Sequence, residues 1–224
     1  MRCGCCGSGR RMKTCANSPG NQSSDARLLD KNRSANTARN MKPLFTVHAG
    51  EYLVGSHIEK HYKKWNIWVP AKDTGIDLLA TNAKNTKTVS FQIKYSKDWT
   101  PTADPSLLNT KLLASGWWSL QEKKIKASKA DFWIFVLPSF IEQSPNYVII
   151  SPTELLRRFY AIFGKSKRFD SYLRVTKSGR CWEERGLKIA DQEMIAFDRF
   201  DDSQRDFTRF LNSNGWLEVE KRLK

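Results

Sequence analysis

The chain has 224 residues, of which 38 are Lys or Arg and 23 are Asp or Glu, and its formal net charge is +15. This length is ample for a sizeable buried core, and the excess of positive charge favours a polyanionic partner. The sequence has no run of about 18 apolar residues, and it begins without the apolar segment of a signal peptide. We therefore expect no membrane span, no membrane partner and a cytoplasmic location.

Residues 1–42 differ in composition from the rest of the chain. They hold nine basic and two acidic residues, no aromatic residue and many Ser, Asn and Gly, a composition that cannot bury a core. We predict a disordered basic tail over residues 1–42 and a single domain over residues 43–224. The spacing of Cys3, Cys5, Cys6 and Cys15 in this tail matches no zinc finger, so we interpret them as reduced thiols.

Residues 47–62 have the apolar spacing of a helix, with Glu51 at its start. A carboxylate there has two interpretations from the residues alone. Glu51 either lies exposed in the first turn, where the helix dipole favours it, or points toward a functional site. His57 and His61 lie four residues apart further along, but the sequence H-I-E-K-H lacks the H-E-x-x-H order of zinc proteases. We interpret both as rim histidines that could face phosphate.

Three strands are predicted after this helix, at residues 66–71, 76–80 and 88–96. The last two flank the polar turn 82–86 and read as a hairpin. Alternation in the third strand places Gln92 and Lys94 on its polar face, and the hairpin brings Asp77 beside them. A carboxylate, an amide and an ammonium at one place suit a hard cation and a phosphate. Asp73 is a rival carboxylate, but it precedes a glycine in a turn, where Asp is common.

The order Asp77, fourteen residues, Gln92-Ile93-Lys94 resembles the PD-(D/E)XK nuclease superfamily, in the Q-x-K variant of Mrr-type restriction enzymes. The resemblance implies that Asp77, Gln92, the Ile93 carbonyl and Glu51 hold Mg²⁺, with Mn²⁺ as a substitute. It also implies that Lys94 positions or helps deprotonate the attacking water. Most members have Glu or Asp at the position of Gln92, and an amide oxygen binds Mg²⁺ more weakly than a carboxylate.

Further along the chain, we expect a long helix over residues 105–127 and a buried strand over residues 131–137. Trp117 and Trp118 could stack on bases, although their spacing in such a helix favours a core position. The remaining predicted elements are strands at 147–150, 172–175 and 181–183, a helix at 152–163, and a terminal helix. Ser203 would cap the terminal helix and Gly215 would end it. Cys181 is expected to be a plain thiol.

The predicted fold class is α/β: a restriction endonuclease-like core of helix, three-strand meander, helix and strand, with C-terminal α/β additions. The function that the resemblance implies is a metal-dependent deoxyribonuclease. Two other classes of protein stay open: a nuclease-like DNA-binding module that has lost catalysis, and a protein-interaction scaffold with a solvated basic surface. DNA is the expected partner, and a homodimer is compatible with the sequence.

Overall fold

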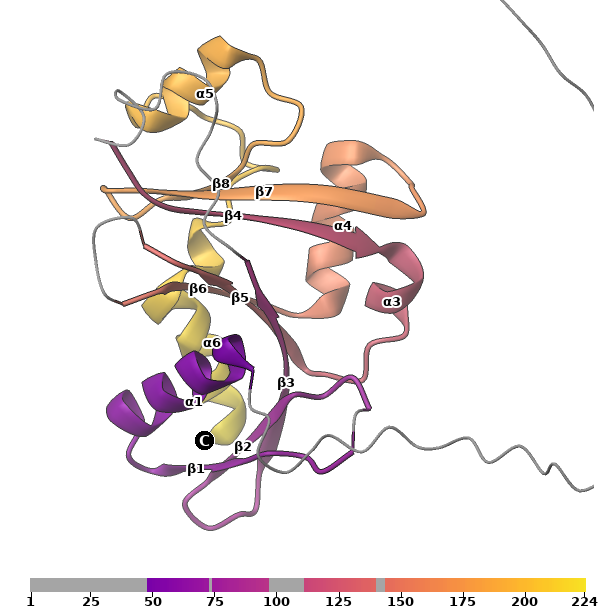
Figure 1. Cartoon of the computed structure of the whole chain (residues 1–224), viewed down its shortest axis with the longest axis vertical. Coiled ribbons are helices and arrows are strands. Elements are labelled where there is room, and N and C mark those ends of the chain that lie inside the picture. Colours follow the sequence, from indigo (N-terminus) through magenta and orange to yellow (C-terminus); the bar gives the residue numbers. More distant parts are fainter. Residues whose placement is uncertain (1–47, 73, 97–110, 140–143) are drawn as a thin grey trace, which may run out of the picture. The chain divides into compact units, whose positions relative to one another are not determined.

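The computed structural model describes residues 48–72, 74–96, 111–139 and 144–224, which all belong to one compact unit of residues 39–224. The predicted tail and Asp73 lie outside the described residues. The described part is a mixed α/β structure with two sheets (Figure 1), so the predicted α/β class is confirmed. None of its helices is long and apolar enough to cross a membrane.

The larger sheet has five strands in the order β1-β2-β3-β5-β6. They are β1 (Trp65–Trp68), β2 (Leu78–Asn82), β3 (Thr88–Tyr95), β5 (Phe132–Leu137) and β6 (Asn146–Ile150). The strands β1, β2 and β3 form an antiparallel meander, β3 and β5 are parallel, and β5 and β6 are antiparallel. The parallel step is possible because the chain leaves this sheet after β3 and returns to it at β5.

Two helices cover one face of this sheet, namely α1 (Ala49–His61) and α6 (Asn212–Leu223) (Figure 1). Their apolar side chains form one core with the alternate residues of β3 that point the same way. This core includes Val54, Ile58, Phe91, Ile93, Trp216 and Val219. The opposite face of β3 therefore carries Ser90, Gln92 and Lys94, as the sequence predicts.

A second sheet of three antiparallel strands packs on that opposite face, on the side of β5 and β6. Its strands are β4 (Leu112–Gln121), β7 (Arg168–Thr176) and β8 (Cys181–Glu183). Together with α4 (Pro152–Phe163) it encloses a second core, to which β5 contributes Trp133, Phe135 and Leu137. Since these side chains lie on the second face of β5, this strand is buried on both sides.

The remaining elements are α3 (Glu122–Lys126), α5 (Ile189–Ala196) and the 3₁₀ turn η1 (Thr208–Phe210). The predicted start of α4 is confirmed, because the Ser151 hydroxyl accepts the Glu154 N–H at 3.3 Å and Pro152 is the first helical residue. The predicted strands around β6, β7 and β8 are also found. Cys181 is a buried free thiol, and burial raises its pKa.

The predicted helix over residues 105–127 is wrong over residues 112–121. Residues 112–121 form β4, whereas Lys111 and Glu122–Lys126 are helical; residues 105–110 lie outside the described residues. Strand β4 pairs with β7 from Leu112 to Gln121, and this long-range pairing overrides the local helical spacing. Gly116 supports the strand, because a Cβ atom there would lie 2.3 Å from the Trp118 ring. A glycine in mid-strand commonly marks such a close approach.

The predicted terminal helix from Ser203 to Gly215 is also wrong. Ser203 lies in a turn, and its carbonyl accepts a hydrogen bond from the buried Arg158 guanidinium at 3.0 Å. Helix α6 begins at Asn212 and continues through Gly215 to Leu223. A Cβ atom at Gly215 would lie 2.3 Å from the Phe210 carbonyl oxygen and 2.9 Å from Ile149. This glycine therefore permits close packing on β6 and does not end the helix. Helix α5 was not expected from the sequence.

Candidate functional site

The first turn of α1 lies directly against the end of β3. A Cβ atom at Gly50 would lie 3.1 Å from the Ile93 Cγ2 atom and 3.0 Å from the Tyr95 Cβ atom, so a glycine is needed for this approach. The next residue, Glu51, is consequently buried, with 4% of its surface exposed. The interpretation of Glu51 as an exposed first-turn residue is therefore wrong. The contact of Gly50 with Ile93 brings the backbone of Glu51 close to the Gln92-Ile93-Lys94 segment.

Asp77 is fixed to the same segment of β3. Its Oδ2 atom accepts a hydrogen bond from the backbone N–H of Ile93 at 2.6 Å, and its own N–H donates to the Phe91 carbonyl at 2.7 Å. Asp77 immediately precedes β2, whose first residue pairs with Phe91. The predicted neighbourhood of Asp77 with residues 92–94 is thus present, and it is held by the carboxylate itself.

Gln92 and Lys94 lie on the face of β3 away from α1, and both are half-buried. The Lys94 ammonium lies 5.1 Å from the centre of the Trp133 ring, a cation–π contact that orients the side chain. The Gln92 amide nitrogen lies 3.8 Å from where a Cβ atom of Gly75 would be, and Gly75 has a φ of +81° that favours glycine. Trp133 is a partner of Lys94 that the sequence did not reveal, because the contact depends on the parallel pairing of β3 with β5.

The candidate site contains few carboxylates. Among the described residues, no group of three or more His, Cys, Asp or Glu side chains is arranged to hold a metal ion. Only two of the four predicted ligands, Asp77 and Glu51, are carboxylates; the other two are the Gln92 amide and the Ile93 carbonyl. All four are oxygen donors, which is the donor type that Mg²⁺ prefers, and Mg²⁺ commonly uses only one or two carboxylates and keeps several waters. The donor chemistry therefore fits this ion.

Another carboxylate on the same face of the sheet, Asp131, has a different role. Its Oδ2 atom accepts hydrogen bonds from the N–H and hydroxyl of Ser90 at 2.8 and 2.7 Å. Its Oδ1 atom accepts a hydrogen bond from Arg222 at 2.9 Å. Asp131, which immediately precedes β5, is therefore hydrogen-bonded to both β3 and α6.

Beyond Lys94, the end of β3 is joined to the second sheet. The Ser96 hydroxyl accepts the Trp117 N–H at 2.9 Å and donates to the Trp117 carbonyl at 3.2 Å. Trp117 is 44% exposed, whereas Trp118 is only 6% exposed and belongs to the core. The expectation of a core position is confirmed for Trp118 and wrong for Trp117, which presents an exposed indole close to the end of β3.

The two histidines of α1 lie elsewhere, toward α6. Their ring centres are 4.6 Å apart, and His57 stacks on Trp216 at 5.3 Å. Burial, together with the smaller effects of the nearby charges of His61 and Lys60, lowers the pKa of His57 from 6.5 to about 4. His61 is exposed, as a rim histidine would be, but His57 is partly enclosed by aromatic rings and by Tyr147.

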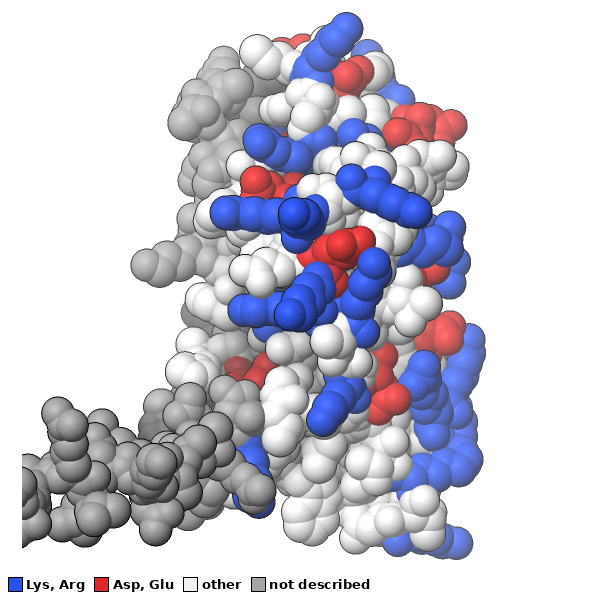
Figure 2. Space-filling model, turned by 90° about the vertical axis from the view of Figure 1, so that its right-hand side faces the viewer, with Lys and Arg blue, Asp and Glu red and all other residues white. Residues whose placement is uncertain are grey.

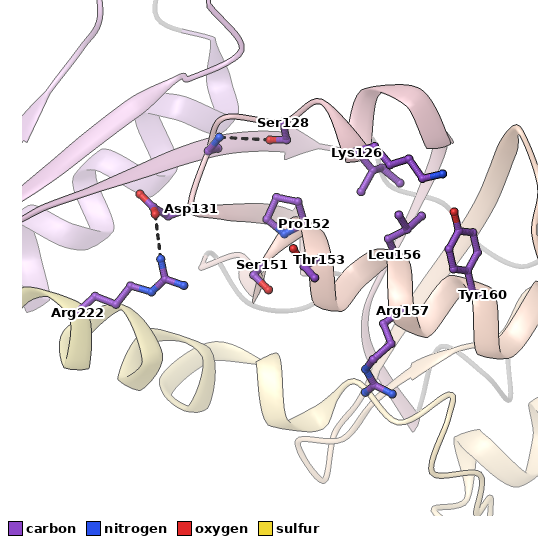
Figure 3. Close-up of a pocket in the computed structure, with 12 residues that line it drawn as sticks. Lys126, Ser128, Asp131, Ser151, Pro152, Thr153, Leu156, Arg157, Tyr160 and Arg222 are labelled. Carbon is purple, nitrogen blue, oxygen red and sulfur yellow. Dashed lines mark hydrogen bonds and ion pairs between the residues drawn. The ribbon is translucent and has the colours of Figure 1, made fainter.

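A cavity of about 750 Å³ lies between α3, the start of β5 and α4 (Figure 3). It contains three cationic side chains, and each has a carboxylate partner. Lys126 lies 2.9 Å from Glu122, Arg157 lies 2.7 Å from Glu154, and Arg222 reaches Asp131. Because these charges are compensated, the cavity offers a weaker attraction for anions than its composition suggests.

Comparisons of this chain with protein-family models, with characterised proteins and with solved structures found no match.

Proposed function

We propose that this chain is a Mg²⁺-dependent nuclease of the PD-(D/E)XK type that hydrolyses phosphodiester bonds in DNA. The observation that carries the proposal is the hydrogen bond from the Ile93 N–H to the Asp77 carboxylate. It keeps the Asp of the D-x₁₄-Q-x-K pattern against the Gln92-Ile93-Lys94 segment. The order of a helix, an antiparallel meander and a strand parallel to β3 supports the proposed restriction endonuclease-like core, although β4 and the short α3 stand where that core has a long helix.

The accessibility of the sheet supports the same position for the site. On the face away from α1, the side chains of β5 are buried by the second sheet, whereas Gln92 and Lys94 on β3 are only half-buried. A phosphate could therefore approach the β2–β3 part of this face.

Figure 2 shows the side of the molecule on which α3 and α4 lie, where Lys and Arg side chains outnumber acidic ones. Such a surface favours a polyanionic substrate.

In the proposed mechanism, Asp77, Glu51, Gln92 and the Ile93 carbonyl would hold the metal ion. Mg²⁺, when bound, would supply Lewis-acid stabilisation of the phosphate and a more acidic water. Lys94 would position the attacking water and offset the negative charge that develops on the phosphate oxygens. The contact of Lys94 with Trp133 restricts the ammonium to one side of β3. The bond of Asp77 to Ile93 fixes the carboxylate before any ligand arrives, which is the preorganisation that such catalysis requires.

A DNA-binding module without catalysis is the second candidate. It is favoured by the amide at Gln92 and by the lack of a group of three metal-binding His, Cys, Asp or Glu side chains among the described residues. Such a module would bind DNA with strong salt dependence but would not cut it.

The two functions are separated by incubating the protein with supercoiled, linear and branched DNA in Mg²⁺, in Mn²⁺ and in EDTA. The proposal predicts cleavage with either metal and none in EDTA. The variant Asp77→Asn should not cut. Asp201→Asn, which changes an exposed carboxylate elsewhere, is its matched control and should cut like wild type. Binding without cleavage under every metal condition would favour the second candidate.

A further inference from the structure

A second cavity, of about 810 Å³, lies at the closed end of the β2–β3 hairpin. Its walls come from the C-terminal end of α1, the hairpin turn and the last turn of α6. Five lysines line it, namely Lys63, Lys64, Lys84, Lys87 and Lys224, and among the described residues of its lining Glu220 is the only acidic one. The cavity is therefore strongly basic.

The charges of this cavity are not compensated as they are in the cavity beside α4. Glu220 lies 3.5 Å from Lys224. Within the described part of the chain, no carboxylate lies within ion-pair distance of the other four lysines. All five lysines are exposed. Four ammonium groups gathered without partners repel one another, and a polyanion would relieve this repulsion.

The hairpin turn that carries two of these lysines is held in one conformation by its own side chains. The Asn82 side chain accepts the Thr86 N–H at 2.9 Å. The Asn85 side chain, whose residue has a φ of 55°, accepts hydrogen bonds from Thr81 at 2.6 Å and from Asn66 at 2.9 Å. Lys84 and Lys87 therefore project from a fixed turn, which lowers the entropy lost when they bind a ligand.

Aromatic side chains lie among the lysines. The rings of Tyr62 and Trp65 stack with their centres 4.2 Å apart and an angle of 15° between their planes. Both line the cavity and are partly exposed. Lysines around aromatic rings are the combination with which proteins bind single-stranded nucleic acid, whose bases stack while its phosphates meet the cations.

We propose that this cavity binds a single strand of nucleic acid. Lys63, Lys64, Lys84 and Lys87 contact its phosphates, and a base lies against the aromatic pair formed by Tyr62 and Trp65. The cavity is distinct from the candidate nuclease site, because Lys87 and Lys94 are separated by the length of β3, about 23 Å at the usual rise of a strand. The proposal does not depend on nuclease activity.

The test measures the binding of a fluorescent 12-nucleotide oligo-dT, and of a duplex of the same length, to the full chain in EDTA, where no cleavage can contribute. The first variant is Lys84→Gln with Lys87→Gln. The matched control is Lys177→Gln with Lys188→Gln, two exposed lysines outside this cavity. The hairpin variant should bind the single strand about tenfold more weakly, with a salt slope reduced by about 1.4, while the control stays close to wild type.

A second variant, Lys63→Gln with Lys64→Gln, should show the same loss, which guards against a local effect on the hairpin turn. Wild-type protein should also bind an abasic oligonucleotide more weakly than oligo-dT, since no base can stack. Equal single-strand affinities for the hairpin variant and the control would overturn the proposal. Equal losses of single-strand and duplex affinity would overturn the assignment of a single strand.

Discussion

The Oδ2 atom of Asp77 accepts a hydrogen bond from the backbone N–H of Ile93 at 2.6 Å. The carboxylate of this residue, which immediately precedes β2, thereby extends the pairing of β2 with β3 and also belongs to the candidate site. Asp77 thus contributes to the fold as well as to the proposed chemistry, and its two contributions can be measured separately.

Replacing Asp77 by Ala should lower the free energy of unfolding by about 0.5–1.5 kcal/mol, because the Ile93 N–H loses its acceptor. Asp77→Asn should be closer to wild type in stability, since the amide oxygen can still accept this bond. Urea denaturation of the two variants measures the difference. If Asp77→Ala were as stable as wild type, the bond would contribute nothing to folding.

Replacing Gln92 by Glu should tighten Mg²⁺ binding, because a carboxylate oxygen suits this ion better than an amide oxygen. Without metal the new charge lies close to Asp77, which should raise the pKa of the pair and lower stability at neutral pH. Gln92→Leu should lose activity, since it offers no oxygen. The measurement is the cleavage rate as a function of Mg²⁺ concentration. Should Gln92→Leu cut like wild type at every concentration, Gln92 is not a ligand.

The lowered pKa of His57 predicts a pH dependence of stability. In the folded state His57 stays neutral down to about pH 4, while in the unfolded state it takes up a proton near pH 6.5. The contribution of neutral His57 to the free energy of unfolding is therefore complete above pH 6.5 and is lost as the pH falls to about 4. Because the ring is only half-buried, we expect a loss on the order of 1–2 kcal/mol.

The check is denaturation of wild type, His57→Phe and His61→Gln between pH 4 and 7. His57→Phe preserves an aromatic ring next to Trp216 and should flatten the pH dependence, and His61→Gln should retain most of it. Identical pH dependence in wild type and His57→Phe would show that His57 is not the group responsible.

Gly116, in the middle of β4, allows the assignment of this strand to be tested. Gly116→Ala should destabilise the protein by about 1–3 kcal/mol, because the added Cβ atom meets the Trp118 ring. Gly55→Ala in α1 is the control: nothing lies within 4 Å of its Cβ position, and alanine should stabilise the helix by up to about 1 kcal/mol. If residues 112–121 were helical, as their sequence predicts, Gly116→Ala would stabilise the protein as well. Thermal or urea denaturation distinguishes the two cases.

The β2–β3 hairpin could be predicted because its signals are local. Alternation places Gln92 and Lys94 on one face, and the polar turn stands between the two strands. The identity of β4 could not be predicted, since its partner β7 lies roughly fifty residues later and its residues satisfy a helical spacing equally well. The burial of Glu51 could not be predicted either, because it depends on the contact of Gly50 with Ile93. Trp133 beneath Lys94 depends in the same way on the pairing of distant strands.

We propose that Asp77 and Lys94 act together in metal-dependent cleavage of DNA. The most direct test of this proposal is the initial rate of plasmid cleavage in Mg²⁺ by wild type, Asp77→Asn, Lys94→Gln and the control Asp201→Asn, with DNA affinity measured in EDTA. We expect Asp77→Asn and Lys94→Gln each to lose at least about 100-fold in cleavage rate while DNA affinity stays near that of wild type. Wild-type cleavage that persists unchanged in both variants, or no cleavage by wild type in any metal, would contradict the proposal.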